Sequence, residues 1–322
     1  MKRAHGGASD KSVLDFSSNV NPLGPPDGVL RVLAQSGELV FAYPVPDADE
    51  FCQAVARHLS VPRECILAGN GATDLIYLIT RLLSGGRARV ITPAFTEYED
   101  ACEAAEIPVN DGDHDVTFLA NPTSPAGQLF SAEEILENPG PLIVDESFID
   151  FAGEEFSLAS KAASDPRLIV LRSLTKFYAI PGLRLGYIVA PPETVLRLKS
   201  LQPPWSVNAL AIAAGVAALE DHNYAERTRK LVPELRENLS SSLKSLDLAP
   251  MASAVNFILC RVPDAALLCR ELLEFGIAAR NCDSFTGLEK NRFVRFAVRG
   301  HEDNTRLLAA LKEIVETCRI TR

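Results

Sequence analysis

The sequence has little positive charge and no long apolar run. It holds 32 lysines and arginines against 42 aspartates and glutamates, a formal net charge of −10 at pH 7. A chain that binds nucleic acid or an anionic membrane usually carries a basic patch, so neither partner is expected. The longest near-apolar run, residues 207–219, contains Asn208 and is shorter than the roughly 20 residues that span a bilayer. It predicts a buried helix instead.

Signals of export and of metal binding are also missing. Residues 1–12 are polar and lack the apolar core of a signal peptide. The seven cysteines form no Cys-x-x-Cys pair and no Cys/His set at zinc spacing. An odd, unpatterned set is typical of reduced thiols that pack as small apolar side chains. We therefore expect a cytoplasmic protein without a metal site.

The composition is that of a soluble globular protein. The chain has 322 residues, of which 47% are hydrophobic and 23% charged, enough for a large core in one or two domains. Strand and helix patterns alternate in the C-terminal third, which indicates a small α+β domain. The periodicity predicts strands over 88–92, 116–120, 141–144, 168–171, 255–261, 277–280 and 293–298, and helices over 28–37, 49–59, 193–202, 211–219, 225–246, 265–274 and 304–318.

Lys176 stands in a segment with almost no other charge, directly after the apolar strand at 168–171. Burial lowers the pKa of a lysine amine and makes it a nucleophile toward carbonyls. Ser173 and Thr175 place hydroxyls beside it, and Arg184 follows a Pro-Gly turn; such groups suit a phosphate monoester. An isolated lysine would more often be solvated, but this combination suggests pyridoxal phosphate (PLP).

A second phosphate-binding candidate is the turn at residues 69–73, Gly-Asn-Gly-Ala-Thr. It ends a strand and opens an amphipathic helix, whose free N–H groups favour an anion. Gly71, Ala72 and Thr73 are therefore candidate cofactor ligands. The turn lacks the third glycine of a dinucleotide-binding fingerprint.

Asp145 follows the apolar strand at 141–144. Open α/β sheets bind ligands at the carboxyl ends of their strands. A carboxylate there could keep the nitrogen of a pyridine ring protonated and make the ring an electron sink. The alternative is that Asp145 only caps the next turn.

Two strings around the lysine, Ser-Leu-Thr-Lys and Pro-Gly-Leu-Arg-Leu-Gly-Tyr, resemble the cofactor segment of the PLP-dependent enzymes of fold type I, the aspartate-aminotransferase fold. The resemblance implies an α/β protein with Lys176, Asp145 and Tyr98 as catalytic residues. It implies a large domain with a mostly parallel, doubly wound sheet of seven strands, and a small α+β domain. We expect an N-terminal arm over 1–40, the large domain over 41–205, and the small domain with bridging helices over 206–322.

The N-terminal strings His-Gly-Gly and Asp-Phe-Ser-Ser-Asn-Val-Asn-Pro-Leu-Gly resemble the arm of threonine-phosphate decarboxylases and histidinol-phosphate aminotransferases. His-Gly-Gly, Phe148 and the string Pro-Trp-Ser-Val-Asn-Ala-Leu-Ala favour the decarboxylases. The resemblance assigns contacts with the phosphate or carboxylate of the substrate to the arm, and anion-binding roles to two arginines. The implied substrate-binding residues are His5, Gly6 and Asn19 in the arm, Arg295 for the α-carboxylate and Arg280 for the distal phosphate.

Aromatic residues complete the expected site. The resemblance places a ring over the pyridine, and Tyr98 fits that position better than Phe95; alternatively, both rings only pack. Tyr43 precedes Pro44 and matches a tyrosine that reaches the cofactor phosphate of the partner in a homodimer. Alone, Tyr43 would more often be a packing residue.

The chain departs from the family pattern at two positions near the cofactor. The loop Asn-Pro-Thr-Ser-Pro-Ala-Gly places Ser124 where the family has an asparagine that bonds the phenolic oxygen of the cofactor. Phe148 replaces a tyrosine that aminotransferases use against the same oxygen. The stretch at 111–115 is short for the family and suggests a trimmed large domain.

These observations favour PLP-dependent decarboxylation of threonine phosphate, a small phosphorylated amino acid, for cobalamin biosynthesis. Histidinol-phosphate aminotransferase is the alternative on the same fold, and the motifs do not report which bond at Cα breaks. A PLP-binding protein without catalysis is a third reading, which intact Lys176, Asp145 and Arg295 oppose.

Overall fold

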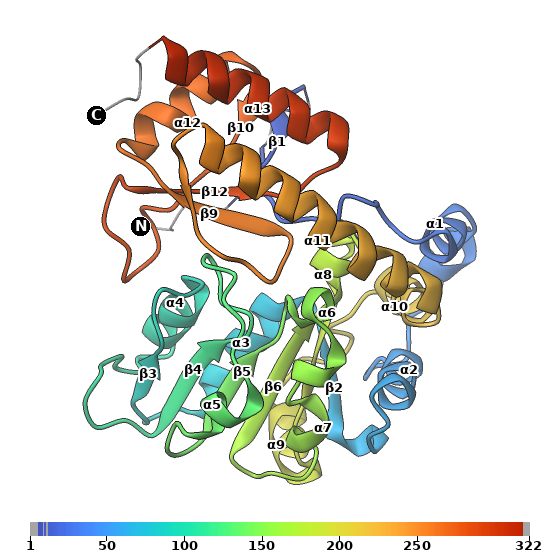
Figure 1. Cartoon of the computed structure of the whole chain (residues 1–322). Coiled ribbons are helices and arrows are strands. Elements are labelled where there is room, and N and C mark those ends of the chain that lie inside the picture. The colour runs from blue at the N-terminus through green and yellow to red at the C-terminus, as the bar shows by residue number, and fades with distance from the viewer. Residues whose placement is uncertain (1–5, 9, 11, 318–322) are drawn as a thin grey trace.

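The computed structural model describes residues 6–8, 10 and 12–317. Its centre is a six-stranded sheet in the order β2-β7-β6-β5-β4-β3, covered by helices, with a smaller sheet above it in Figure 1. Neighbouring strands from β6 to β3 are parallel, and β7 runs antiparallel to both β6 and β2. The predicted mostly parallel sheet is confirmed. Its strands are β2 (Ile66–Gly69), β3 (Ala88–Val90), β4 (Val116–Ala120), β5 (Leu142–Asp145), β6 (Leu168–Ser173) and β7 (Gly186–Val189).

The expected seventh strand is wrong for the part of the chain that the structure describes. Val109 makes only an isolated parallel bridge to Ala88 at the end of β3. The segment between α4 (Glu97–Ala104) and β4 also contains the exposed stretch 110–113. The chain is too short here to return along the whole of β3, so one bridge forms where a strand was expected.

Both faces of the large sheet are buried, because successive side chains of a strand point to opposite faces. Val144 and Val170 contribute to one hydrophobic cluster, whereas their neighbours Ile143 and Leu171 contribute to another. Helices close both faces. The helical elements of this part are α1 (Asp27–Ala34), η1 (Ser36–Val40), α2 (Asp49–Leu59), η2 (Arg63–Cys65), α3 (Ala72–Leu82), α4, α5 (Ala132–Leu136), α6 (Ile149–Ala152), η3 (Glu154–Phe156), α7 (Ala159–Ala162), α8 (Leu174–Phe177), η4 (Pro181–Leu183) and α9 (Pro192–Leu201).

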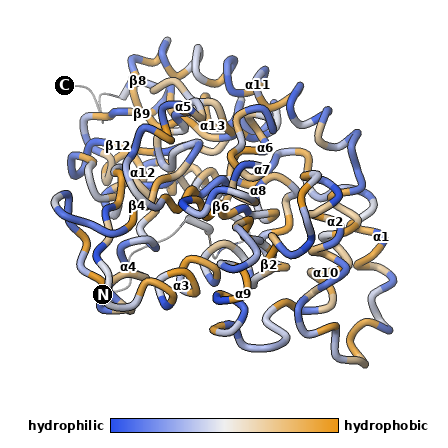
Figure 2. Tube along the Cα trace, turned by 90° about the horizontal axis from the view of Figure 1, so that it is seen from below, coloured by the Kyte–Doolittle hydropathy of each residue, from blue (hydrophilic) through white to orange (hydrophobic). Residues whose placement is uncertain are grey.

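Helix α10 (Ala209–Leu219) is the buried helix predicted from the near-apolar run. The side chain of Asn208 caps it by accepting a hydrogen bond from the Ala211 N–H, at 2.8 Å. A Cβ on Gly215 would lie 2.3 Å from Leu185, so only glycine allows this close packing. Figure 2 shows α10 as hydrophobic, in contrast to the largely hydrophilic α11 (His222–Ser245). Helix α10 packs into the core of the large sheet, although it lies beyond residue 205; the division there stays a prediction.

Helix α11 connects the two parts of the molecule. Its residues Tyr224 and Val232 belong to the core of the large sheet, whereas Leu235 and Leu239 belong to the core of the small one. The small part contains β8 (Ala249–Pro250), β9 (Phe257–Arg261), α12 (Ala265–Glu274), β10 (Ile277–Ala278), β11 (Arg280–Asn281), β12 (Phe293–Ala297) and α13 (His301–Glu316).

The strand predicted over 277–280 is wrong as a single element. Its first half, β10, pairs with β1 (Leu14–Asp15) of the N-terminal arm, and its second half, β11, pairs with β12. The two short strands belong to different sheets, and Ala279 lies between them outside both strands. The arm therefore joins the small part of the molecule.

Two further features bear on the expectations from sequence. Of the six described cysteines, all are free and five are buried, as expected for thiols that pack as apolar side chains. Among the described residues, none of the helices combines the length and hydrophobicity that crossing a membrane requires.

Candidate active site

A cavity of about 210 Å³ lies where the large sheet, the arm and the small sheet meet. The strands β4, β5 and β6 direct their carboxyl ends to it, as expected for an open α/β sheet. Most of the residues predicted from sequence line it, although they come from all parts of the chain. These are Gly6, Asn19, Ala72, Thr73, Tyr98, Ser124, Asp145, Ser173, Thr175, Lys176, Arg184, Arg280 and Arg295.

Lys176 lies on the short helix α8, directly after β6. Burial, together with the positive charges of Arg295 and Arg184, lowers the pKa of its amine to about 8, although Asp15 opposes this shift. A substantial fraction of the amine is therefore neutral near physiological pH. The predicted nucleophilic lysine is chemically suited to its role.

The predicted phosphate cradle consists of a helix start, two hydroxyls and a guanidinium. Gly71 has φ +85°, and a Cβ on it would lie 2.6 Å from the Arg184 Nη2, so glycine is required. The α3 N-terminus follows at once and offers free N–H groups. The Ser173 and Thr175 hydroxyls lie 2.8 Å apart and line the same cavity. The set fits a phosphate monoester.

Asp145 is held from two sides. The Tyr98 O–H donates to Oδ2 at 2.5 Å, and the Ser147 N–H donates to Oδ1 at 2.8 Å. Burial raises the pKa of Asp145, and the hydrogen bonds from Ser147 and Tyr98 oppose that rise. The carboxylate is thus oriented toward the cavity by groups that stabilise its charge.

The contact of Tyr98 with Asp145 gives this tyrosine a role that the sequence analysis missed. Its ring lies edge-on to Phe95, with centroids 6.0 Å apart, and is stacked on Phe118 at 5.8 Å. Both Tyr98 and Phe95 line the cavity. The assignment of Tyr98 as the ring over the pyridine stays a prediction. The Tyr98 hydroxyl, in turn, positions the carboxylate.

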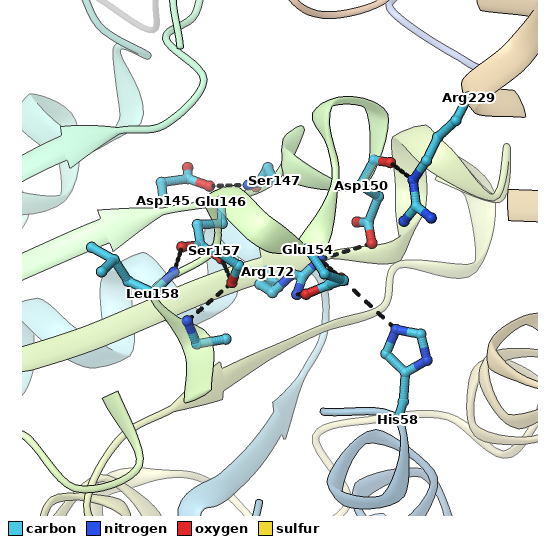
Figure 3. Close-up of polar contacts among 11 residues, drawn as sticks. His58, Asp145, Glu146, Ser147, Asp150, Glu154, Ser157, Leu158, Arg172 and Arg229 are labelled. Atoms are coloured by element: carbon cyan, nitrogen blue, oxygen red, sulfur yellow. Dashed lines mark hydrogen bonds and ion pairs between the residues drawn. The ribbon is translucent and has the colours of Figure 1, made fainter. Parts of the chain in front are cut away.

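The residue after Asp145 belongs to a buried ionic network (Figure 3). Glu146 is fully buried and accepts hydrogen bonds from the Leu158 N–H and the Ser157 hydroxyl. Burial raises its pKa to about 7, although nearby Arg172 opposes that rise. Successive residues of an extended chain point to opposite sides. Glu146 therefore faces away from the cavity that Asp145 lines.

Arg172 on β6 is the cation of this network. Its Nη2 lies 2.8 Å from Asp150 and 2.7 Å from Glu154, and its side chain is 1% exposed. His58 lies 3.8 Å from Glu154. These ion pairs connect the segment that follows Asp145 to the strand that precedes Lys176. An arginine in an apolar strand was the sequence signal for this network, and it was missed.

Two arginines form the opposite wall of the cavity. Arg280 and Arg295 are direct cross-strand partners on β11 and β12. The Arg295 Nη1 donates to Ser124 Oγ and its Nη2 to the Ser17 carbonyl, both at 3.2 Å. The Arg280 Nη2 donates to Ser284 Oγ at 2.7 Å. Two guanidinium groups at neighbouring positions suit a ligand with two anionic groups.

The N-terminal arm brings Gly6 and Asn19 to the cavity wall; their contacts with a substrate stay a prediction. A Cβ on Gly6 would lie 2.2 Å from the Ser17 carbonyl oxygen, and the Gly7 N–H donates to Ser17 Oγ at 2.8 Å. His5 lies outside the described residues. Further lining residues without a predicted ligand role include Ser17, Ser18, Phe95, Ser147, Phe148 and Phe285.

Tyr43 is not part of this cavity in its own chain. Its side chain is 85% exposed and lies on the indole of Trp205, with ring centroids 5.2 Å apart. The exposed Phe41 and Val45 are close in sequence. The structure therefore places Tyr43 on an apolar surface.

A buried lysine with a lowered pKa, an oriented carboxylate and the predicted phosphate cradle at the strand ends of this sheet fit an α/β enzyme of the PLP-dependent fold type I. The family model for aminotransferase class I and II matches residues 11–113 and 108–311, so the chain belongs to this family. The family depends on pyridoxal phosphate. The required glycine at 71, the lowered pKa of Lys176 and the buried Asp145 all fit that group.

The names of similar proteins give two different activities, a decarboxylase in some and an aminotransferase in others. A threonine-phosphate decarboxylase of Salmonella typhimurium is 36% identical over 340 residues, which cover 96% of this chain and 93% of that protein. The solved L-threonine-O-3-phosphate decarboxylase of Porphyromonas gingivalis has a TM-score of 0.85 at 29% identity, covering 94% and 100%. The solved histidinol-phosphate aminotransferase of Clostridium acetobutylicum has a TM-score of 0.89 at 28% identity, covering 95% and 100%.

Replacing Arg172 by glutamine is expected to lower the free energy of unfolding by about 3 kcal/mol, because Asp150 and Glu154 lose their shared cation. Urea unfolding followed by circular dichroism measures the change. The exposed Arg197 provides the matched control; Arg197→Gln should change stability by less than about 0.5 kcal/mol. Equal effects of the two variants would contradict the role of the network.

The pKa of Lys176 predicts how the apoprotein takes up its cofactor with pH. Only the neutral amine attacks an aldehyde, so the rate of covalent PLP capture, trapped with borohydride, should rise about tenfold per pH unit and level off above pH about 8. Arg295→Gln removes a positive charge that lowers this pKa, so the inflection should move to higher pH. An unmoved inflection would show that Arg295 does not act on the amine.

Proposed function

We propose that this protein decarboxylates L-threonine O-3-phosphate to (R)-1-aminopropan-2-yl phosphate, with PLP as cofactor. Decarboxylases of this kind supply that product to the nucleotide loop of cobalamin. The activity named for the relatives from Salmonella typhimurium and Porphyromonas gingivalis supports the proposal. The free cysteines of the described chain support a reducing, cytoplasmic location.

The observation that carries the proposal is the pair of cavity-lining arginines. Arg280 and Arg295 are register partners, and side chains at such positions start roughly 5 Å apart. They therefore suit two anionic groups on one small molecule. Threonine phosphate carries a carboxylate on Cα and a phosphate on the oxygen of Cβ. Histidinol phosphate carries a phosphate but no carboxylate.

Each part of the site has a task in this reaction. Bound PLP supplies an aldehyde for amines and a ring that accepts the electron pair released at Cα. Asp145, oriented by Tyr98 and Ser147, would keep the ring nitrogen protonated. Arg295 and Arg280 would hold the substrate by its two anions and so select the bond at Cα that breaks. Lys176 is the only amine among the described lining residues, and it would return a proton to Cα.

Histidinol-phosphate aminotransferase is the second candidate, favoured by the TM-score of 0.89 to the solved enzyme from Clostridium acetobutylicum. The two activities share the lysine, the carboxylate and the phosphate cradle. The aminotransferase would break the Cα–H bond instead and would pass the amino group to a 2-oxo acid. Phe148 at the cavity wall opposes it, because aminotransferases of this family commonly have a tyrosine there.

The deciding experiment gives the purified holoenzyme O-phospho-L-threonine and measures the carbon dioxide released. Histidinol phosphate with 2-oxoglutarate is tested in parallel for glutamate formation. We expect carbon dioxide in the first assay and no glutamate in the second. Lys176→Ala should abolish carbon dioxide release, because the amine that binds the cofactor is lost. Glutamate formation without carbon dioxide would establish the aminotransferase instead.

We further propose a homodimer in which Tyr43 serves the partner's cofactor phosphate. Its exposure beside Phe41, Val45 and Trp205 supports this, since an apolar surface of this kind favours association. Tyr43→Ala should weaken cofactor binding. A mixture of Lys176→Ala and Tyr43→Ala subunits, refolded together, should regain activity, because each hybrid dimer has one intact site. A mixture no more active than the average of its two components would contradict a shared site.

A further inference from the structure

The helix that carries Lys176 is too short to hold itself in place. Helix α8 has four residues, Leu174–Phe177, whereas isolated helices shorter than about twelve residues are marginal in water. The Ser173 side chain caps its beginning by accepting a hydrogen bond from the Thr175 N–H, at 3.3 Å. The last carbonyls of a helix have no partner inside it. The end of α8, which includes Lys176, therefore depends on groups from other segments.

Asn21 of the N-terminal arm supplies two of those groups. Its backbone N–H donates to the Lys176 carbonyl at 3.0 Å, and its side-chain Nδ2 donates to the Phe177 carbonyl at 2.8 Å. Asn21 is only 3% exposed, so both bonds are shielded from water. The residues joined by the side-chain bond lie 156 positions apart in the chain. The arm thus binds the end of the lysine helix through a tertiary contact.

The side chain of Asn21 is itself held in one orientation. Its Nδ2 also donates to Thr228 Oγ1 of α11 at 2.9 Å, and its Oδ1 accepts from the Leu23 N–H at 3.1 Å. Together with the bond to the Phe177 carbonyl, these contacts engage both the amide nitrogen and the carbonyl oxygen of the side chain. Asn21 therefore connects the arm, the lysine helix and the bridging helix α11.

Tyr224 of α11 places a second donor on the same carbonyl. Its hydroxyl oxygen lies 3.0 Å from the Phe177 carbonyl oxygen and 2.7 Å from the Gly24 carbonyl oxygen in the arm. Its ring is stacked on Tyr178, with centroids 5.8 Å apart. Neither Tyr224 nor Asn21 is among the described residues that line the cavity. Both side chains can therefore act on the chemistry only through the backbone of α8.

We propose that Asn21 is a positioning residue for Lys176: it binds the end of α8 to the arm and to α11, and so sets where the lysine amine reaches within the cavity. A misplacement of about 1 Å at a reacting group can cost about a hundredfold in rate, so the backbone that carries the amine must be fixed. The inference rests on the proposed function only through the cofactor role of Lys176. It holds for whichever bond at Cα breaks.

The test measures how fast the full-length apoprotein binds PLP covalently when PLP is saturating. Borohydride traps the imine, and mass spectrometry of peptides locates it at Lys176. At about pH 9 most of the amine is neutral, because its pKa is about 8, so the rate reports position and not protonation. Asn21→Ala removes the side-chain bonds and should slow capture about tenfold. A rate within about twofold of the wild-type rate would overturn the proposal.

Asn304 provides the matched control for a loss of stability. It is also buried, and its side chain makes two hydrogen bonds with the backbone of Arg299 in the small part, at 2.7 Å and 3.1 Å. Asn304→Ala should lower the free energy of unfolding in urea as Asn21→Ala does, but it should leave the capture rate unchanged. Equal slowing by the two variants would indicate a purely structural role and would overturn the proposal.

Tyr224→Phe tests the same anchor even if Asn21→Ala does not fold, because it keeps the ring and removes only the hydroxyl. It should slow capture about threefold, since the Phe177 carbonyl keeps its donor from Asn21. In the double variant this carbonyl loses both side-chain donors, so the rate should fall by more than the product of the single effects. Independent effects would contradict a shared anchor. Capture contains no decarboxylation step, so failure of the proposed function, seen as absent carbon dioxide from the wild-type enzyme, would leave these rates unaffected.

Discussion

The buried ion pairs of Arg172 are the constraint on which the active site depends. Arg172 belongs to β6, and its partners Asp150 and Glu154 belong to the segment that follows β5. Asp145 ends β5 and Lys176 follows β6, so the network fixes the two strand ends that carry the chemistry. A buried cation left without its anions would be costly. The ion pairs thereby hold the two strand ends in one arrangement. They do so from the side that faces away from the cavity.

The charge of the cavity wall is opposite in sign to the net charge of the whole chain. The chain has a net charge of −10, whereas the described cavity wall carries Lys176, Arg184, Arg280 and Arg295 against Asp145 alone. Local positive charge attracts anionic ligands whatever the net charge. Burial, and after it the charges of Arg295 and Arg184 from this set, lower the pKa of Lys176. One cluster of cations thus both suits anionic ligands and helps to keep the amine neutral.

Much of the fold could be predicted from residue patterns. The helices over Asp49–Leu59 and Ala265–Glu274 and the strand over Val116–Ala120 have the predicted bounds, because their apolar periodicity is strong. The seventh strand and the single strand over 277–280 were wrong. Strand formation depends on a partner at the right distance, and neither the short stretch before β4 nor the break at Ala279 reveals its partner in the sequence.

The sequence by itself determined the chemical groups of the site and the family. The lysine string, the glycine turn and Asp145 are local patterns, and the structure brings nearly all their residues to one cavity. Only the tertiary structure decided what those groups contact. The bonds of Tyr98 to Asp145 and of Ser124 to Arg295 join residues 47 and 171 positions apart. Such contacts depend on how distant elements pack and where their side chains point, which no local pattern encodes.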